Sequence, residues 1–436
     1  AIALIVMAKY FLPLFLEKKI YTMPQFLEQR FDKRVSLVLS FFWLIVYIFI
    51  NLTSVLWLGS LAINALTGLD LFNGLVLLAL FSLAYSLSGG LKAVAMTDVV
   101  QVVLLIFGGL AVSYIALDKI SESVGIFEGM RIVASEMPEK FDMILSKDNP
   151  SYQNLPGIWI LLGLGVWIGH FFYWGFNQYI TQRALGAKSI KEAQKGIMFA
   201  AYLKLLMPIV IVLPGICAAI LFPVLEKSDQ AYPTMMSLLP NGLLGLTFAA
   251  LIAAIVSSLA SMSNSISTIF TMDIYRYFKG GEISQSNLIK VGRYTVVISL
   301  LISSLVAQPL LGSFESIFQY IQNFTGYFSP GIVVIFLVAL FWKKATSLSV
   351  LIAALISLFG SIFISLQFPD LPFIHRMTVV FLLSAIGCWL TTFLQGYKDQ
   401  EKAINLNNMD FSTSKAFNIN TFIIVAALGI IYITLG

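Results

Sequence analysis

The stretch LGLTFAALIAAIVSSLASMSNSISTIFTMDI, residues 244–274, decides the fold of this 436-residue chain. It is long enough to cross the hydrocarbon core of a bilayer, which takes ~20 apolar residues in a helix. Near its middle, Ala254-Ile-Val-Ser-Ser258 places two adjacent hydroxyls at bilayer depth. Because no water is available there, these oxygens need a neighbouring helix, a backbone carbonyl or a bound hard cation.

The composition extends this interpretation to the whole chain. Hydrophobic residues make up 58% of the sequence, charged residues 11%, and the mean hydropathy is +0.89. A soluble globule of this composition could not cover its surface with polar groups, so we predict an all-α polytopic membrane protein. The expected spans are 37–66, 71–88, 97–118, 157–180, 197–225, 244–274, 292–308, 316–341, 347–368, 372–397 and 417–436.

Residues 1–16 read as one further, truncated span. Residue 1 is already in an apolar run, and no charged leader precedes it. We therefore expect the fold to be N-terminally truncated here, with the natural chain beginning further upstream.

The distribution of positive charge predicts the orientation. Most of the 27 Lys and Arg residues lie in alternate connections, and these are 17–35, 89–97, 181–196, 275–293, 342–346 and 398–416. The positive-inside rule makes this set cytoplasmic and places the C-terminus outside a cell inner (plasma) membrane. The expected surroundings are a lipid bilayer, and no basic patch with interleaved aromatic residues suggests nucleic acid as a partner.

The connection 119–156 is the one long hydrophilic stretch. Its apolar residues recur at roughly helical spacing, which predicts one or two amphipathic helices over the outer face. Such helices could cap an outer vestibule, or they could form a plain linker.

Glycine is unevenly distributed among the spans. It is dense in 157–180, while Gly326 and Pro330 interrupt 316–341. Because each glycine lowers helix stability by ~1 kcal/mol, we expect these two spans to break or to pack very closely. Broken helices hold ions and substrates in carriers, but glycine also forms ordinary close-packing surfaces between membrane helices.

Two groups of polar residues suggest the passage of a cation. Ala254, Ser257 and Ser258 offer a carbonyl and two hydroxyls within one turn, part of the oxygen shell that Na⁺ needs, although the packing of small residues would also explain them. Asp98 begins span 97–118, where it is either a helix cap or a relay point for a cation leaving toward the cytoplasm.

Other polar residues suit a neutral solute. His170 lies in mid-span, one turn before Tyr173, and its imidazole could bind a hydroxyl-rich ligand or bond a carbonyl in the core. Lys204 is deep in 197–225, so its ammonium points into a cavity or snorkels to the surface.

The helix over 316–341 carries an amide face. Gln319, Gln322 and Asn323 follow helical spacing, with Phe318 beside them. Amides both donate and accept hydrogen bonds, which suits a sugar or polyol, whereas hydrogen bonding between helices is the other interpretation.

The sequence contains none of the common motifs of enzyme active sites. It has no glycine-rich nucleotide loop, no HExxH, no Cys/His metal spacing and no nucleophile elbow. Cys217 and Cys388 fall inside predicted helices and suggest no disulfide framework. We therefore expect neither an enzyme nor a resident cofactor.

Several longer strings, taken together, resemble the sodium/solute symporter family and within it the bacterial sodium/galactose branch. They run in family order over nearly the whole chain and are Lys9-Tyr-Phe-Leu-Pro13, Ile20-Tyr-Thr-Met-Pro-Gln-Phe26, Asn51-Leu-Thr-Ser-Val55, Ser88-Gly-Gly-Leu91, Thr97-Asp-Val-Val-Gln101, Tyr173-Trp-Gly-Phe-Asn-Gln-Tyr179, Ala254-Ile-Val-Ser-Ser-Leu-Ala-Ser261, Phe270-Thr-Met-Asp-Ile-Tyr275 and Phe318-Gln-Tyr-Ile-Gln322.

The resemblance implies a leucine-transporter-like inverted repeat of five plus five helices that works by alternating access. The corresponding domains are 1–118 for the remainder of the first repeat, 119–156 for the outer connection, 157–341 for the second repeat and 342–436 for three additional helices.

The resemblance also implies residue roles. Sodium would be bound by Ala254, Ser257 and Ser258, and Asp98 matches an aspartate linked to sodium passage. Lys204 and Gln322 would bind the sugar with Phe318 beside it, and Tyr173 would form the inner gate. His170 stands where the family has a sugar-binding asparagine, which leaves the identity of the solute open.

The expected function is sodium-coupled symport of a sugar such as galactose or glucose. Symport of a polyol, sialic acid or amino acid, a solute sensor that does not transport, and a nonfunctional truncated product are the alternatives. The family's remaining sodium and sugar ligands fall upstream of Ala1, so we expect residues 1–436 alone not to transport. The oligomeric state stays open.

Overall fold

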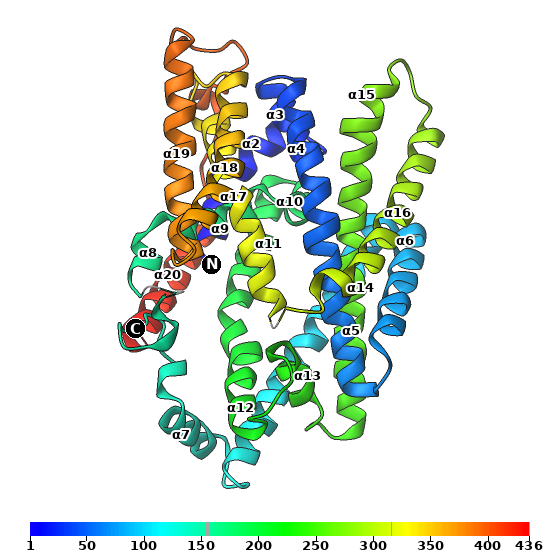
Figure 1. The fold of residues 1–436 in the computed structure, drawn as a ribbon, viewed down its shortest axis with the longest axis vertical. Coiled ribbons are helices and arrows are strands. Elements are labelled where there is room, and N and C mark those ends of the chain that lie inside the picture. The colour runs from blue at the N-terminus through cyan, green and yellow to red at the C-terminus, as the bar shows by residue number, and fades with distance from the viewer. Residues whose placement is uncertain (154, 156, 315, 436) are drawn as a thin grey trace. The chain divides into compact units, whose positions relative to one another are not determined.

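The computed structural model describes residues 1–153, 155, 157–314 and 316–435, without the side chains of residues 88–95, 150, 153 and 408. Every regular element in these ranges is a helix (Figure 1). The α-helices are α1 (Ile2–Val6), α2 (Leu12–Glu17), α3 (Met23–Arg30), α4 (Lys33–Ile45), α5 (Thr53–Thr67), α6 (Leu71–Ile120), α7 (Ile126–Glu136), α8 (Trp159–Leu162), α9 (Leu164–Phe171), α10 (Gln178–Leu185), α11 (Ile190–Met207), α12 (Leu213–Leu221), α13 (Ala231–Met236), α14 (Asn241–Ile269), α15 (Arg276–Lys279), α16 (Gln285–Leu311), α17 (Ile317–Phe341), α18 (Ser347–Gln367), α19 (Phe373–Leu394) and α20 (Lys415–Thr434).

Short segments of other helical geometry join several of these helices. The π-helical segments are η1 (Met7–Phe11), η2 (Val46–Leu52), η5 (Phe172–Phe176), η6 (Pro208–Val212) and η8 (Phe270–Tyr275). The 3₁₀ turns are η3 (Pro138–Lys140), η4 (Pro150–Gln153), η7 (Ser228–Gln230) and η9 (Leu406–Asn408).

The described helices match the predicted spans closely. Nine helical segments are long and apolar enough to cross a membrane, and they are Lys33–Thr67, Met96–Ile120, Ile190–Leu221, Asn241–Lys279, Gln285–Leu311, Ile317–Phe341, Ser347–Gln367, Phe373–Leu394 and Lys415–Thr434. The span predicted at 71–88 corresponds to a shorter apolar stretch, Leu71–Leu87. The span predicted at 157–180 is a broken helix.

One predicted connection is wrong. The sequence predicts a connection at 89–97 that separates two spans, but α6 runs without interruption from Leu71 to Ile120. The glycine pair at 89–90 weakens the helix by only ~1 kcal/mol per residue, and no proline follows it in this stretch. Hydropathy marks where polar residues lie, but it does not say whether the backbone there leaves the helix.

The glycine-rich span breaks as expected. Gly163 is extended between α8 and α9. Asn177, which follows the end of η5 at Phe176, is also extended before α10 begins. Glycine also permits close packing here, because a Cβ on Gly165 would lie 2.2 Å from the carbonyl oxygen of Ile374. The two interpretations of these glycines, helix breaking and close packing, therefore both hold in the same span.

Of the two expectations for span 316–341, the break is wrong, since α17 continues through Gly326 and Pro330. Serines of α18 replace the backbone bonds that the proline disturbs. Ser357 Oγ accepts a hydrogen bond from the Gly331 N–H at 2.9 Å, and Ser361 Oγ donates to the Tyr327 carbonyl at 3.0 Å. Such side-chain bonds allow a membrane helix to carry an internal proline.

The chain divides into two compact units. Unit 1 comprises Ala1–Phe42, Asp142–Leu205 and Gln322–Gly436, and unit 2 comprises Trp43–Phe141 and Leu206–Ile321. Three of the four divisions fall inside α4, α11 and α17, and the fourth lies between Phe141 and Asp142. The predicted domains 1–118, 119–156, 157–341 and 342–436 describe repeat symmetry rather than compactness, so they stay a prediction.

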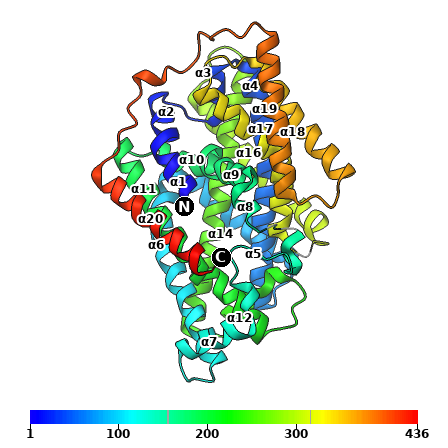
Figure 2. The same cartoon turned by 90° about the vertical axis from the view of Figure 1, so that its left-hand side faces the viewer.

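In unit 2, α14 packs along α6 and also contacts α5 and α16 (Figures 1 and 2). Small residues permit this contact. A Cβ on Gly108 of α6 would lie 2.5 Å from a methyl group of Thr247 of α14. The two helices that carry Asp98 and Ser257 are therefore held close together.

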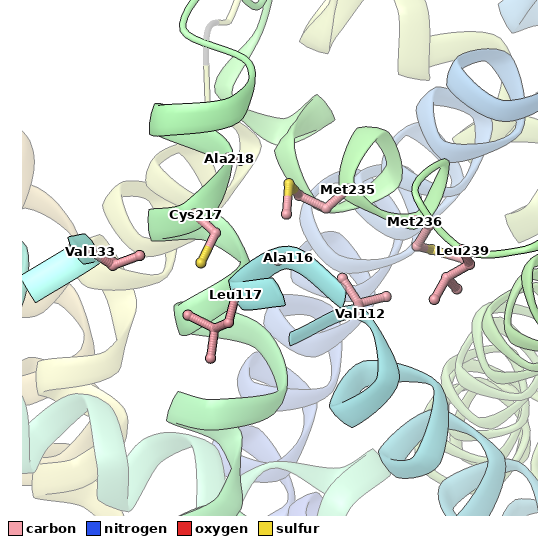
Figure 3. Packing of buried hydrophobic residues seen from close by; sticks show 9 residues of the cluster. All are labelled: Val112, Ala116, Leu117, Val133, Cys217, Ala218, Met235, Met236 and Leu239. Atoms are coloured by element: carbon pink, nitrogen blue, oxygen red, sulfur yellow. The ribbon is translucent and has the colours of Figure 1, made fainter. Parts of the chain in front are cut away.

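The connection 119–156 contains one α-helix, α7, followed by short turns. Gly129 of α7 packs on α6, where an added Cβ would meet the Leu117 carbonyl oxygen at 2.1 Å. Figure 3 shows the buried apolar cluster beneath it, drawn from α6, α7, α12, α13 and the residue Leu239. Its members are Val112, Ala116, Leu117, Val133, Cys217, Ala218, Met235, Met236 and Leu239.

In unit 1, α18 packs along α19, and α19 also contacts α9 (Figures 1 and 2). A buried arginine fixes the C-terminal end of α17. Arg30, only 3% exposed, donates hydrogen bonds to carbonyl oxygens of that end and of the turn after it, which belong to Ala339, Trp342, Lys343 and Ala345. The last carbonyls of a helix have no partner within it, so the guanidinium acts as a cap for α17 through its bond to the Ala339 carbonyl.

Candidate ion and solute site

Ser257 and Asp98 meet in unit 2. Ser257 is 2% exposed on α14, and its hydroxyl donates a hydrogen bond to the Asp98 carboxylate on α6. Asp98 lies inside α6 and therefore does not cap a helix, so the interpretation of Asp98 as an N-cap is wrong. Asp70 caps α6 instead, accepting from the backbone N–H groups of Phe72 and Asn73.

Ser258 lies next to this pair and remains available. Among the residues that the structure describes, its hydroxyl makes no hydrogen bond. Ala254 is partly buried one turn earlier on the same helix. This part of α14 and α6 thus gathers hydroxyl and carboxylate oxygens, the donor type that hard cations prefer.

The hydroxyls further along α14 behave differently. Ser265 Oγ donates to the Ser261 carbonyl of its own helix at 3.0 Å, and Thr268 and Thr271 bond back to the helix in the same way. These residues need no ligand. Over the described ranges, no three His, Cys, Asp or Glu side chains gather into a group that could hold a metal ion.

Lys204 and the residues around His170 lie in unit 1. Lys204 Nζ on α11 lies 4.9 Å from the centroid of the Trp174 ring on η5, which is a cation–π distance. The side chain is therefore directed at the broken helix, and this contact favours the inward orientation over snorkelling.

Trp174 was given no role by sequence reasoning. It occurs four residues after His170, and helical spacing puts such residues on one face. This spacing was the signal that could have identified it.

His170 sits at the end of α9, where η5 begins. Its side chain is exposed, and within the described part of the chain the imidazole has no hydrogen bond. The interpretation of His170 as a core histidine bonded to a carbonyl is therefore wrong. Both ring nitrogens are left for another partner.

Tyr173 is 37% exposed and joins the two sides of the helix break. Its hydroxyl accepts a hydrogen bond from the Tyr179 hydroxyl at 2.9 Å. The rings of Trp174 and Tyr179 meet it edge-on, at centroid distances of 4.9 and 6.2 Å. The tyrosine predicted as a gate is thus held by aromatic neighbours on η5 and α10.

The amide face of α17 is exposed. In the described structure the side chains of Gln319, Gln322 and Asn323 make no hydrogen bonds, so no bonding between helices involves them. Phe318 is 66% exposed one turn before Gln322. Phe318 belongs to unit 2 and Gln322 to unit 1.

These features define a class of protein. A helical chain with spans that suit a membrane, oxygen ligands on packed helices and unpaired polar side chains beside a helix break has the features of a secondary membrane transporter. A model of the sodium:solute symporter family matches residues 1–358. The chain therefore belongs to the sodium:solute symporter family, as its sequence motifs predicted.

Individual proteins similar to this chain are also sodium cotransporters. The chain is 44% identical over 450 residues to the sodium/glucose cotransporter of Vibrio parahaemolyticus, covering 99% of this chain and 82% of the relative. It is 33% identical over 372 residues to the human sodium/myo-inositol cotransporter 2, covering 78% of this chain and 54% of the relative. The chain thus spans about half the length of that human relative.

A solved structure is similar in fold. A Na⁺-coupled sialic acid symporter in a substrate-bound outward-open state superposes with a TM-score of 0.76 at 24% identity, covering 90% of this chain and 82% of that chain. The expectation of an all-α, leucine-transporter-like membrane protein is confirmed.

Proposed function

We propose that this protein couples the entry of Na⁺ to the uptake of a sugar such as galactose or glucose, by alternating access. Family membership and the identity to a sodium/glucose cotransporter support the reaction. The single observation that carries the ion site is the contact of Ser257 with Asp98 beside the unpaired hydroxyl of Ser258. Ion binding would favour the conformation that accepts sugar, which couples the two ligands.

The ion would bind to the oxygens of Ala254, Ser257 and Ser258. Because Ser257 directs its proton to Asp98, the lone pairs of its oxygen are left for a cation. The carboxylate also supplies a negative charge in a region where an isolated cation would be costly. Asp98 would therefore orient the Ser257 hydroxyl and attract the ion as it leaves inward.

The sugar would be bound by His170, Lys204 and Gln322. The imidazole and the amide have no partners within the described chain, so their donors and acceptors suit sugar hydroxyls. Phe318 offers an exposed ring for the apolar face of a pyranose, and Tyr173 would close the inner side.

A polyol is the second candidate solute. His170 replaces the asparagine of the sugar-transporting branch, and several relatives are sodium/myo-inositol cotransporters. In either case we place the protein in the cell inner (plasma) membrane with its C-terminus outside, as the positive-inside rule predicts from the sequence.

Uptake into liposomes tests the proposal. The full-length natural protein is reconstituted, and labelled galactose, glucose and myo-inositol are offered with an inward gradient of Na⁺, K⁺ or choline. We expect accumulation only with Na⁺, lost in a Ser257→Ala/Ser258→Ala variant and kept in Ser265→Ala, which changes a back-bonded serine of the same helix. Equal accumulation in choline would refute the proposal.

A further inference from the structure

Unit 1 contains an apolar cavity away from the residues discussed above. Its volume is about 130 Å³, and it lies between α3 and α4 on one side and α17 and α18 on the other. Leucine, valine, isoleucine, alanine and phenylalanine side chains form most of its wall, among them Leu27, Val35, Leu39, Ile335 and Val350. An apolar cavity of about this size does not hold water stably, so it favours an apolar occupant.

The polar groups in the wall are already engaged. Ser357 Oγ accepts from the Gly331 N–H at 2.9 Å and donates to the Tyr327 carbonyl at 3.3 Å. These are the hydrogen bonds that satisfy the α17 backbone groups next to Pro330. Because the wall offers no free hydroxyl, a sugar or a metabolite with several hydroxyls would lose its hydrogen bonds with water and gain none here.

One wall of the cavity is open. Val38 and Leu355, which line it, are 48% and 49% exposed, whereas Leu27 and Val350, which also line it, are fully buried. The opening lies between α4 and α18, and the helical segments that contain both are apolar enough to span a membrane. In a bilayer this opening therefore faces lipid, and the molecules with access to it are lipids.

The groove ends at a cluster of positive charge. Leu27 and Val35 flank the segment 28–34, and the segment 343–347 is tied to it. Arg30 donates hydrogen bonds to the carbonyls of Lys343 and Ala345. The basic residues of the two segments are Arg30, Lys33, Arg34, Lys343 and Lys344, against Glu28 and Asp32.

Ion pairs cancel only part of this charge. Lys33 pairs with Glu28 at 2.8 Å, and Arg34 pairs with Asp32 at 2.9 Å while its side chain stays 78% exposed. Lys344 pairs with Asp399 at 3.5 Å, so Lys343 is the residue of the segment 343–347 that adds a further positive charge. The resulting positive excess complements a phosphate, and each basic residue near a membrane surface attracts anionic lipid by about 1 kcal/mol.

We propose that this groove binds one acyl chain of an anionic phospholipid, whose phosphate lies against Arg34 and Lys343. The apolar wall excludes polar ligands, the opening faces the hydrocarbon, and the charge selects the headgroup. The bound chain fills the space between α4 and α18 and leaves the ion and solute residues uncovered. The proposal does not depend on which solute is transported.

Native mass spectrometry of the purified full-length protein tests the proposal, with dioleoyl phosphatidylglycerol and dioleoyl phosphatidylcholine added in equal amounts. We expect one retained phosphatidylglycerol per chain. Ala354→Trp places an indole in the groove and should abolish retention, whereas Ala385→Trp, at a similarly half-buried position of α19 outside the groove, should leave it unchanged.

Surface variants cover the case in which the tryptophan prevents folding. Arg34→Gln and Lys343→Gln should each reduce the preference for phosphatidylglycerol by about fivefold. Retention by Ala354→Trp equal to that of the unchanged protein would overturn the site. Equal retention of the two lipids by the unchanged protein would overturn the role of the charges.

Discussion

Ser257 of α14 donates a hydrogen bond to the carboxylate of Asp98 on α6, a residue 159 positions earlier in the chain. The bond joins two residues that the sequence linked to sodium for separate reasons. It gives Asp98 a definite task, which is to orient the hydroxyl of a proposed sodium ligand.

The first prediction concerns this bond. In the full-length protein, Asp98→Ala removes both the acceptor and the charge, so we expect the Na⁺ concentration for half-maximal uptake to rise at least about tenfold, a change of ~1.4 kcal/mol. Asp98→Asn keeps an acceptor, so its Na⁺ concentration for half-maximal uptake should fall between those of the unchanged protein and Asp98→Ala. If Ser257→Ala and Asp98→Ala act through one contact, the double variant should be little worse than the more severe of the two single variants. Full additivity in a sodium titration would contradict the coupling.

The second prediction concerns solute choice. His170 has no hydrogen-bond partner in the described chain. The family resemblance implies that it stands where the sugar-transporting branch has an asparagine. His170→Asn should shift preference toward galactose by about tenfold or less relative to myo-inositol, since one polar contact changes. Competition against labelled galactose measures this ratio, and a ratio unaffected by the substitution would show that His170 does not touch the solute.

The third prediction separates charge from packing at Lys204. Its ammonium lies over Trp174, a contact worth ~0.5–2 kcal/mol. Lys204→Met should raise the solute KM several-fold. Lys204→Arg should raise the KM less, because the cation and its contact with the ring remain. Trp174→Leu should weaken solute binding as well. Arg and Met variants with the same KM would argue against a role for the charge.

The fourth prediction concerns stability. Burial lowers the pKa of Arg30 to about 10, so the guanidinium remains charged near neutral pH while it caps α17. Arg30→Met leaves buried carbonyls unpaired, and we expect a loss of about 1–3 kcal/mol in stability. Arg34→Met removes an exposed ion pair and should cost little. Melting temperatures of the two variants in detergent should differ clearly, with the Arg30 variant lower.

The fifth prediction is a pH dependence at the start of α17. Asp229 accepts a hydrogen bond from the Ile317 N–H at 2.7 Å, and burial raises its pKa above the ordinary value despite this bond and the charge of Lys227. The folded chain therefore holds this proton more tightly than the unfolded chain. Protonated Asp229 therefore contributes to the stability of the folded chain. This contribution is fully present below the ordinary pKa of 3.8 and is lost as pH rises through the raised pKa.

Asp229→Asn keeps an acceptor for Ile317 and does not titrate. We expect the melting temperature of the unchanged protein to fall, relative to this variant, as pH rises above about 4. Asp410→Asn, at an exposed position outside the membrane spans, serves as the control. Parallel pH curves for the unchanged protein and Asp229→Asn would contradict the assignment.

Much of the architecture could be predicted because membrane spans are local. Each span needs its own run of apolar residues, and the run that contains Ser257 is visible without knowledge of its neighbours. The glycines of 157–180 likewise act on their own backbone, so the break at Gly163 could be expected. Family motifs added the residues expected to carry ion and solute.

The tertiary structure decided what depends on partners distant in the sequence. The partner of Asp98, the ring beneath Lys204 and the serines of α18 that keep α17 continuous at Pro330 all come from other helices. Hydropathy also gave no reason to join residues 71–120 into one helix. The sequence by itself determined which segments prefer the membrane and which side chains are polar there, because transfer from water to lipid is a property of each residue. Which of those polar groups satisfy one another and which remain free for a ligand was decided only by folding, because a hydrogen bond needs two groups at one place.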